Sequence, residues 1–135
     1  MKVAVIDGQG GKMGQMIIER IKSSGLACEL IAIGTNSIAT SAMLKAGASA
    51  GATGENAAAL ASRDADVIIG PIGIIAADSL LGEVTPAMAV AIGQSKAKKL
   101  LLPVNLCNNI IIGAGSLPMA KLITEAVEEL AKMMQ

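Results

Sequence analysis

The chain contains no histidine, phenylalanine, tyrosine or tryptophan. The absence of imidazole excludes Ser-His-Asp and Cys-His nucleophiles and histidine-ligated metal sites, and we expect no metal centre. The absence of aromatic rings removes the platforms on which nucleic-acid bases stack. Two cysteines, Cys28 and Cys107, are too few for the disulfide framework of a small secreted domain.

Charge is also scarce and evenly balanced. Only 16% of residues are charged, and eleven Lys and Arg match eleven Asp and Glu, so the chain lacks the basic patch of a nucleic-acid or membrane-surface binder. The one long uncharged stretch, residues 100–120, contains prolines and asparagines that lipid would not accommodate. Lys2 is followed at once by a strand-like run, which is unlike a signal peptide. We therefore expect a soluble, cytoplasmic protein without a nucleic-acid or membrane partner.

Short apolar runs alternate with helical patterns along the whole chain. Continuous apolar runs typical of strands buried on both faces occupy residues 3–6, 30–33, 67–69 and 100–102. Weaker strand signals occupy residues 48–52 and 110–112. Helical patterns begin near residues 12, 36, 57, 85 and 116. This alternation predicts a single α/β domain over residues 1–135: a Rossmann-like, doubly wound and mostly parallel sheet with helices on both faces.

The first loop carries the sharpest functional signal. Gly8, Gly10 and Gly14 lie between a predicted strand and a predicted helix, where glycines let backbone N–H groups approach a phosphate. Lys12 in the first helical turn would add positive charge. The plainer interpretation is that the glycines only allow a tight turn and close helix packing. The strand-to-helix context favours phosphate binding by about two to one.

A dinucleotide site would normally have an acidic residue at the end of the second strand, where it binds the ribose hydroxyls. Here that position is occupied by Gly34-Thr35-Asn36-Ser37, without an acid. This disfavours plain NAD and leaves NADP, a mononucleotide or another phosphorylated ligand open.

Several other loops would meet at the same sheet edge, because ligands of such sheets bind outside the carboxyl ends of the strands. They are rich in Gly, Asn and Thr, which suits anions and hydroxyls. The candidate ligand-binding residues are Gly8, Gln9, Gly10, Gly11, Lys12, Met13, Gly14, Thr35, Asn36, Asn56, Gly70, Pro71 and Asn105.

Two residues could carry chemistry instead of binding. Asp7 precedes the glycine loop; we favour an Asx-type turn over a catalytic or Mg²⁺-binding carboxylate, since no second acid is near in sequence. Cys107 has no histidine to activate it, and a lone cysteine is more often inert. Asp78 and Glu83 flank Leu80 and Leu81, and we expect them to be solvated or part of a mobile cover.

The segments Val5-Ile6-Asp7-Gly8-Gln9-Gly10-Gly11, Gly51-Ala52-Thr53-Gly54-Glu55-Asn56-Ala57, Gly70-Pro71-Ile72-Gly73-Ile74 and Pro103-Val104-Asn105-Leu106-Cys107-Asn108 together resemble a family of short Rossmann-like proteins of unknown function from anaerobic bacteria. The resemblance covers the whole chain. It implies a small Rossmann-like protein without a second domain, and it brings no activity, substrate or catalytic residue.

These patterns leave three functions open. The leading one is a non-catalytic or accessory module that binds a nucleotide or dinucleotide phosphate at Gly8–Gly14. The second is a small enzyme acting on a phosphorylated metabolite through Asp7 or Cys107. The third is a structural subunit without a ligand. Because small side chains and few charges should leave apolar surface uncovered, we also expect a homodimer or larger homo-oligomer.

Overall fold

The computed structural model describes residues 1–104 and 108–135. Five strands form one parallel sheet in the order β3-β2-β1-β4-β5. The strands are β1 (Lys2–Asp7), β2 (Glu29–Gly34), β3 (Ala50–Thr53), β4 (Val67–Pro71) and β5 (Lys98–Leu102). This is the strand order of a doubly wound, Rossmann-like sheet, as predicted. The strands all run in the same direction, but successive strands are added on one side of β1 up to β3 and on its other side from β4 onward, so the strand order reverses between β1 and β4.

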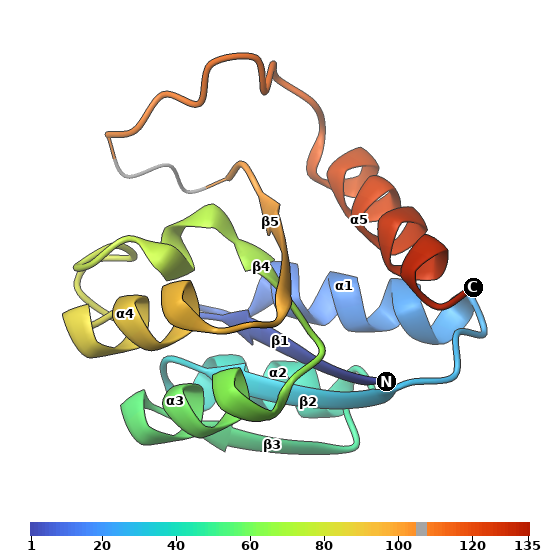
Figure 1. The fold of residues 1–135 in the computed structure, drawn as a ribbon, viewed down its shortest axis with the longest axis horizontal. Coiled ribbons are helices and arrows are strands. Elements are labelled where there is room, and N and C mark those ends of the chain that lie inside the picture. Colours follow the sequence, from blue (N-terminus) through green and yellow to red (C-terminus); the bar gives the residue numbers. More distant parts are fainter. Residues whose placement is uncertain (105–107) are drawn as a thin grey trace.

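The helices cover both faces of the sheet (Figure 1). The first core cluster joins alternate residues of β1, such as Val3 and Val5, to α1 (Lys12–Ser23), α2 (Ser37–Lys45) and α5 (Met119–Met133). The second joins Ala4 and Ile6 to α3 (Glu55–Asp64), α4 (Pro86–Gln94) and the 3-10 turn η1 (Ile72–Ile75). Strand residues point alternately to the two faces, so a continuous apolar run serves both layers.

The helix ends follow the expected local chemistry. The side chain of Asn36 accepts a hydrogen bond from the backbone N–H of Ala39, and Thr85 caps α4 through the N–H of Met88. Positive φ angles at Gly25 and Gly47 follow the ends of α1 and α2. These local signals mark where α2 and α4 start and where α1 and α2 end.

The expected last strand at residues 110–112 is wrong. These residues form turns and irregular backbone outside the sheet, in the long excursion between β5 and α5 (Figure 1). Asn108 before them and Gly113 after them both have positive φ angles, which interrupt an extended chain. The turn residues on either side therefore prevent a strand here, despite the high β-propensity of the apolar residues.

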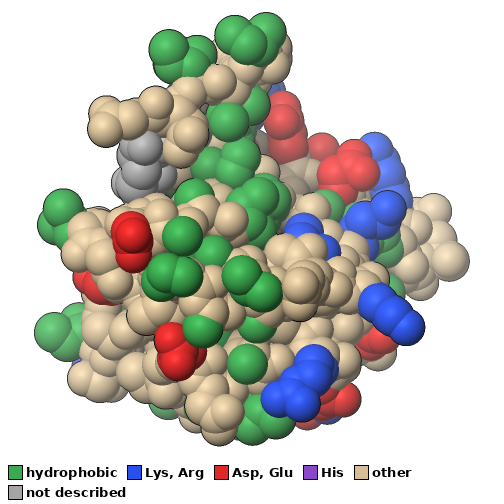
Figure 2. Space-filling view, turned by 60° about the vertical axis from the view of Figure 1, so that its left-hand side comes forward, with side chains coloured by type: hydrophobic (Ala, Val, Ile, Leu, Met, Phe, Trp, Pro, Cys, Tyr) green, Lys and Arg blue, Asp and Glu red, His purple; other side chains and the backbone are tan. Residues whose placement is uncertain are grey.

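Apolar side chains remain exposed at separate places. They include Ile38, Leu81, Ile110 and Ile112, the last of which is 90% exposed. On the face shown in Figure 2, apolar side chains gather beneath the protruding segment and across the middle of the face, while Lys and Arg side chains lie toward one side. The homo-oligomer expected from this exposure stays a prediction.

The helices of residues 1–104 and 108–135 include none that is both long enough and apolar enough to cross a bilayer.

Candidate functional site

The glycine loop lies where the sequence places it, between β1 and α1 at the reversal of strand order. Gly11 has a φ of 73°, and a Cβ added there would meet the backbone of Ala39 at 2.7 Å. Glycine is therefore required at this position both by backbone conformation and by the close approach of α2. The packing interpretation of the glycines is correct for Gly11 and also for Gly8 and Gly14, where an added Cβ would meet the side chains of Thr35 and Met43 respectively. It does not exclude a ligand at Gly10, where an added Cβ would meet nothing within 4 Å.

Asp7 holds this loop together. Its carboxylate accepts the backbone N–H of Gly8 at 2.8 Å and that of Gly14 at 2.7 Å, and the residue is 4% exposed. The turn-holding role was predicted, but the partners are one and seven residues ahead rather than two. Gly14 is the third residue of α1, so Asp7 satisfies an amide that the first helical turn leaves unpaired.

Burial raises the pKa of the Asp7 carboxyl above its usual value, and the charge of Glu83 raises it further. The two backbone N–H bonds favour the ionised form and offset part of this shift. A buried carboxyl with a raised pKa is a feature of many catalytic acids. Here, however, each carboxylate oxygen already accepts a bond from the protein's own loop, which favours a structural role.

Glu83 is the residue that the sequence did not predict for the site. Its Oε1 accepts three hydrogen bonds: from the backbone N–H of Gln9 at 2.7 Å, from Oγ1 of Thr35 at 2.6 Å and from Nδ2 of Asn36 at 2.8 Å. Among the described residues, none donates a hydrogen bond to Oε2. The expectation that Glu83 is solvated or in a mobile cover misses this anchoring at the ends of β1 and β2.

The electrostatics of Glu83 reflect these bonds. Partial burial raises the pKa of its carboxyl, but the hydrogen bonds from Thr35, Gln9 and Asn36 outweigh burial and hold the pKa below its usual value. Glu83 therefore stays ionised at neutral pH. No sequence motif marks it, because it lies 48 residues from Thr35 and 74 from Gln9.

The loop that carries Glu83 is fixed at its base. Leu80 is 2% exposed in the core between the sheet and α4, and the N–H of Asp78 donates to the carbonyl of Val84 at 2.7 Å. Asp78, Leu80 and Leu81 all have positive φ angles, which fold this segment back on itself. The buried leucine thus positions the carboxylate three residues later.

The loop amides divide into used and free groups. Gly8 and Gly14 donate to Asp7, Gln9 donates to Glu83, and Gly11 donates to the carbonyl of Gly8. No described residue accepts a hydrogen bond from the backbone N–H groups of Gly10, Lys12 or Met13. These three donors, one just before α1 and two in its first turn, therefore stay available for an anion.

The remaining candidate residues differ in which of their atoms are accessible to a ligand. The Met13 side chain is buried in the core, so only the backbone of Met13 can contact a ligand. Both Nδ2 donors of Asn36 are occupied, by Glu83 and by the carbonyl of Gln9. Gly70 and Pro71 end β4 in buried positions, and Asn56 is exposed in the first turn of α3. Asn105 and Cys107 lie outside the described residues.

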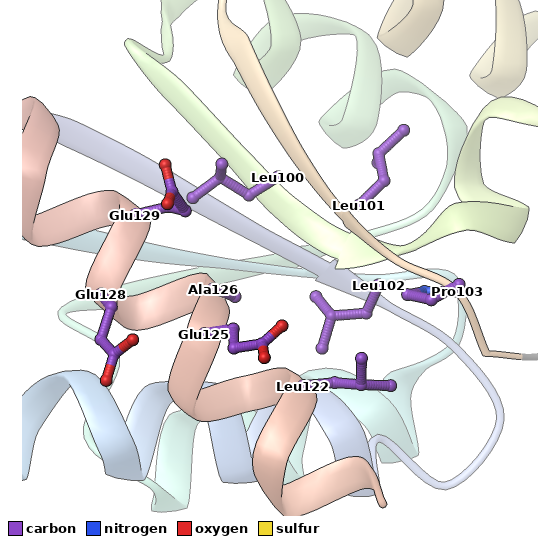
Figure 3. Close-up of a pocket in the computed structure, with 9 residues that line it drawn as sticks. All are labelled: Leu100, Leu101, Leu102, Pro103, Leu122, Glu125, Ala126, Glu128 and Glu129. Atoms are coloured by element: carbon purple, nitrogen blue, oxygen red, sulfur yellow. The ribbon is translucent and has the colours of Figure 1, made fainter. Parts of the chain in front are cut away.

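Several hollows lie elsewhere on the described part of the chain, and two of them adjoin the ends of strands. A cavity of about 200 Å³ follows β4 and is lined by Ile72, Gly73, Ile75, Ala76, Asn109 and Ile111. A groove of about 280 Å³ lies between β5 and α5, where Leu102 and Leu122 point toward each other (Figure 3). Three glutamates line this groove, Glu125, Glu128 and Glu129, so it is unsuited to a phosphate. Of these two, the first lies at the carboxyl edge of the sheet, after β4 and beside the reversal of strand order.

Comparison with known proteins identifies a family but no ligand or reaction for this chain. No curated protein matches the chain. A solved structure, a dodecameric FMN-dependent UbiX-like decarboxylase from Escherichia coli O157:H7, is similar over 99% of this chain and 94% of its own, with 11% identity and a TM-score of 0.47. Residues 2–135 match a family described as Domain of unknown function (DUF3842). The chain belongs to this family of unknown function.

Proposed function

We propose that the protein binds a nucleotide through its phosphate at the start of α1, as a binding module rather than a catalyst. The observation that carries the proposal is the set of backbone N–H groups at Gly10, Lys12 and Met13, for which no described residue provides an acceptor. Backbone donors at a helix N-terminus attract anions because the helix dipole adds partial positive charge there. Their place at the reversal of strand order is where ligands of such sheets bind.

The rest of the ligand would extend from this loop along the sheet edge. On the β4 side, the cavity lined by Ile72, Ile75 and Ile111 offers apolar walls to a base or a second nucleotide half. On the β2 side, the carboxylate of Glu83, held by the hydroxyl of Thr35, supplies a polar group. A dinucleotide lying across the reversal point would use both sides, whereas a mononucleotide would use one.

The bonding of Asp7 supports binding over turnover. A general acid or base must have an oxygen that the substrate can reach to exchange a proton. Asp7 is instead only 4% exposed, and each of its oxygens accepts a hydrogen bond from an N–H group of the loop. For Asp7, the alternative of an enzyme acting on a phosphorylated metabolite has the raised pKa of this buried carboxyl in its favour. Cys107, the other residue of that alternative, lies outside the described residues.

The absorption spectrum of the purified protein tests the proposal directly. With no Trp, Tyr or Phe, the chain is nearly transparent near 260 nm, so a band there after removal of nucleic acid reports a bound nucleotide. Mass spectrometry of the released compound identifies it. We then expect calorimetric binding of AMP or NAD to protein stripped of its ligand. A blank spectrum together with no binding of either probe at millimolar concentration would favour a purely structural role.

A substitution in the loop locates the site. Gly10→Leu should abolish binding, because the leucine side chain would occupy the space proposed for the phosphate. It should not unfold the domain, because a Cβ at Gly10 meets nothing within 4 Å. Gly93→Leu is the matched control, since Gly93 is equally open but lies in α4. Retained affinity in folded Gly10→Leu would contradict the proposed place of the phosphate.

A further inference from the structure

The structure brings an acidic side chain to a position that the sequence leaves without one. Doubly wound sheets that bind nucleotides commonly have a carboxylate at the carboxyl end of the second strand, where it accepts hydrogen bonds from the ribose hydroxyls. Here β2 ends in Gly34, followed by Thr35 and Asn36. The hydroxyl of Thr35 and the amide of Asn36 both donate to Glu83, which arrives from the segment between η1 and α4.

We infer that Glu83 is the specificity-determining residue of the nucleotide site: its carboxylate accepts a hydrogen bond from the 2′-hydroxyl of an unmodified ribose and repels a 2′-phosphate. This inference rests on the proposed function and narrows the ligand to nucleotides with a free 2′-hydroxyl. It also reverses the sequence-based preference for NADP over NAD.

The hydrogen bonds of Glu83 prepare it for this role. Three donors fix Oε1, and no described residue donates to Oε2, so one carboxylate oxygen is held in place and remains able to accept. A preorganised acceptor loses little side-chain entropy when a ligand binds. Thr35 and Asn36 act as positioning residues, because their donors are spent on Glu83 rather than on a ligand.

The glycine loop links this acceptor to the phosphate donors. The N–H of Gln9 donates to Glu83, while no described residue accepts a hydrogen bond from the N–H of the next residue, Gly10. A Cβ added at Gly8 would lie 2.9 Å from Oε1 of Glu83, so the carboxylate packs directly on the loop. Gly10 would thus bind the 5′-phosphate, while its neighbour Gln9 holds the carboxylate that would bind the ribose. The negative charge of that carboxylate disfavours a second phosphate on the ribose.

The described residues beside Glu83 offer no cation to reverse this preference. A 2′-phosphate is normally accommodated by a nearby arginine. The groups bonded to Glu83 are a backbone amide, a hydroxyl and a carboxamide, and none carries a positive charge. Lys12 stands in the first turn of α1, on the phosphate side of the loop.

Calorimetry with three adenine nucleotides tests the inference. We expect wild-type protein to bind AMP at least about tenfold more tightly than 2′-deoxy-AMP, the loss expected for one hydrogen bond to a charged acceptor. Adenosine 2′,5′-bisphosphate should bind more weakly than AMP. In Glu83→Gln, the preference for AMP over the bisphosphate should shrink at least about tenfold, since the amide keeps an oxygen for the three donors but loses the charge.

Glu55→Gln is the matched control. Glu55 lies on α3 and accepts a hydrogen bond from Thr85, so this substitution removes the same charge near the site without touching the loop. We expect Glu55→Gln to keep the wild-type ratios. If Glu83 only anchors its own segment, Glu83→Gln will unfold more easily but will bind the nucleotides in wild-type ratios, which overturns the inference alone. If none of the three nucleotides binds wild-type protein, the proposed function falls and this inference with it.

Discussion

Oε1 of Glu83 lies 2.7 Å from the backbone nitrogen of Gln9, although the two residues are 74 positions apart in the chain. This bond ties the glycine loop to the segment before α4. Asp7 binds the same loop from the other end, through Gly8 and Gly14. Two carboxylates therefore hold the loop, and the amides of Gly10, Lys12 and Met13, which no described residue accepts, are left for a ligand.

Asp7→Asn should destabilise the fold by about 1–3 kcal/mol. The carboxamide has one oxygen and one NH₂ group, so it can accept from Gly8 or Gly14 but not from both. Urea unfolding of both proteins measures the difference. Asp78→Asn is the control, because Asp78 is exposed and its φ of 66° suits asparagine well. Equal stability of Asp7→Asn and Asp78→Asn would contradict the turn-holding role of Asp7.

The two carboxylates should affect stability in opposite directions as pH changes. The pKa of Asp7 is raised in the folded protein, so its contribution is fully present below the unfolded value of about 3.9 and is lost as pH rises through the folded pKa. The pKa of Glu83 is lowered, so its contribution is present above the unfolded value of about 4.3 and is lost as pH falls through the folded pKa.

Urea unfolding between pH 3 and pH 8 checks these signs. The stability difference between wild type and Glu83→Gln should be largest above about pH 5 and should shrink toward pH 3. The difference between wild type and Asp7→Asn should instead be largest at low pH. A wild-type advantage over Asp7→Asn that grows with pH would show that hydrogen bonding, rather than burial, dominates the pKa of Asp7.

Gly70→Ala should cost about 1–3 kcal/mol, because a Cβ there would lie 2.3 Å from the carbonyl oxygen of Ile6 in the neighbouring strand. Strand β4 would have to shift away from β1, at the point where the sheet reverses its order. Gly93→Ala, in open space on α4, should instead stabilise by about 0.5 kcal/mol. Thermal unfolding compares the two variants. A harmless Gly70→Ala would mean that β1 and β4 are less closely packed than this contact requires.

The sequence by itself determined the architecture, because the signals for it are local. Apolar runs such as Val3–Ile6 and Val67–Ile69 specify strands buried on both faces, and Asn36 and Thr85 cap helices through amides three residues ahead. The glycine loop was predictable for the same reason, since strand, glycines and helix are contiguous. Where local signals conflicted, as at residues 110–112, β-propensity alone misled.

Only the tertiary structure decided which groups meet at the loop. Glu83 reaches Thr35 and Gln9 because buried Leu80 anchors its segment and left-handed residues fold it back, and neither feature has a pattern in the sequence. The sequence therefore indicated a site lacking an acid beside β2, whereas folding supplies one from the far side of the sheet's reversal. Side-chain hydrogen bonds across long sequence separations depend on packing, which periodicity does not encode.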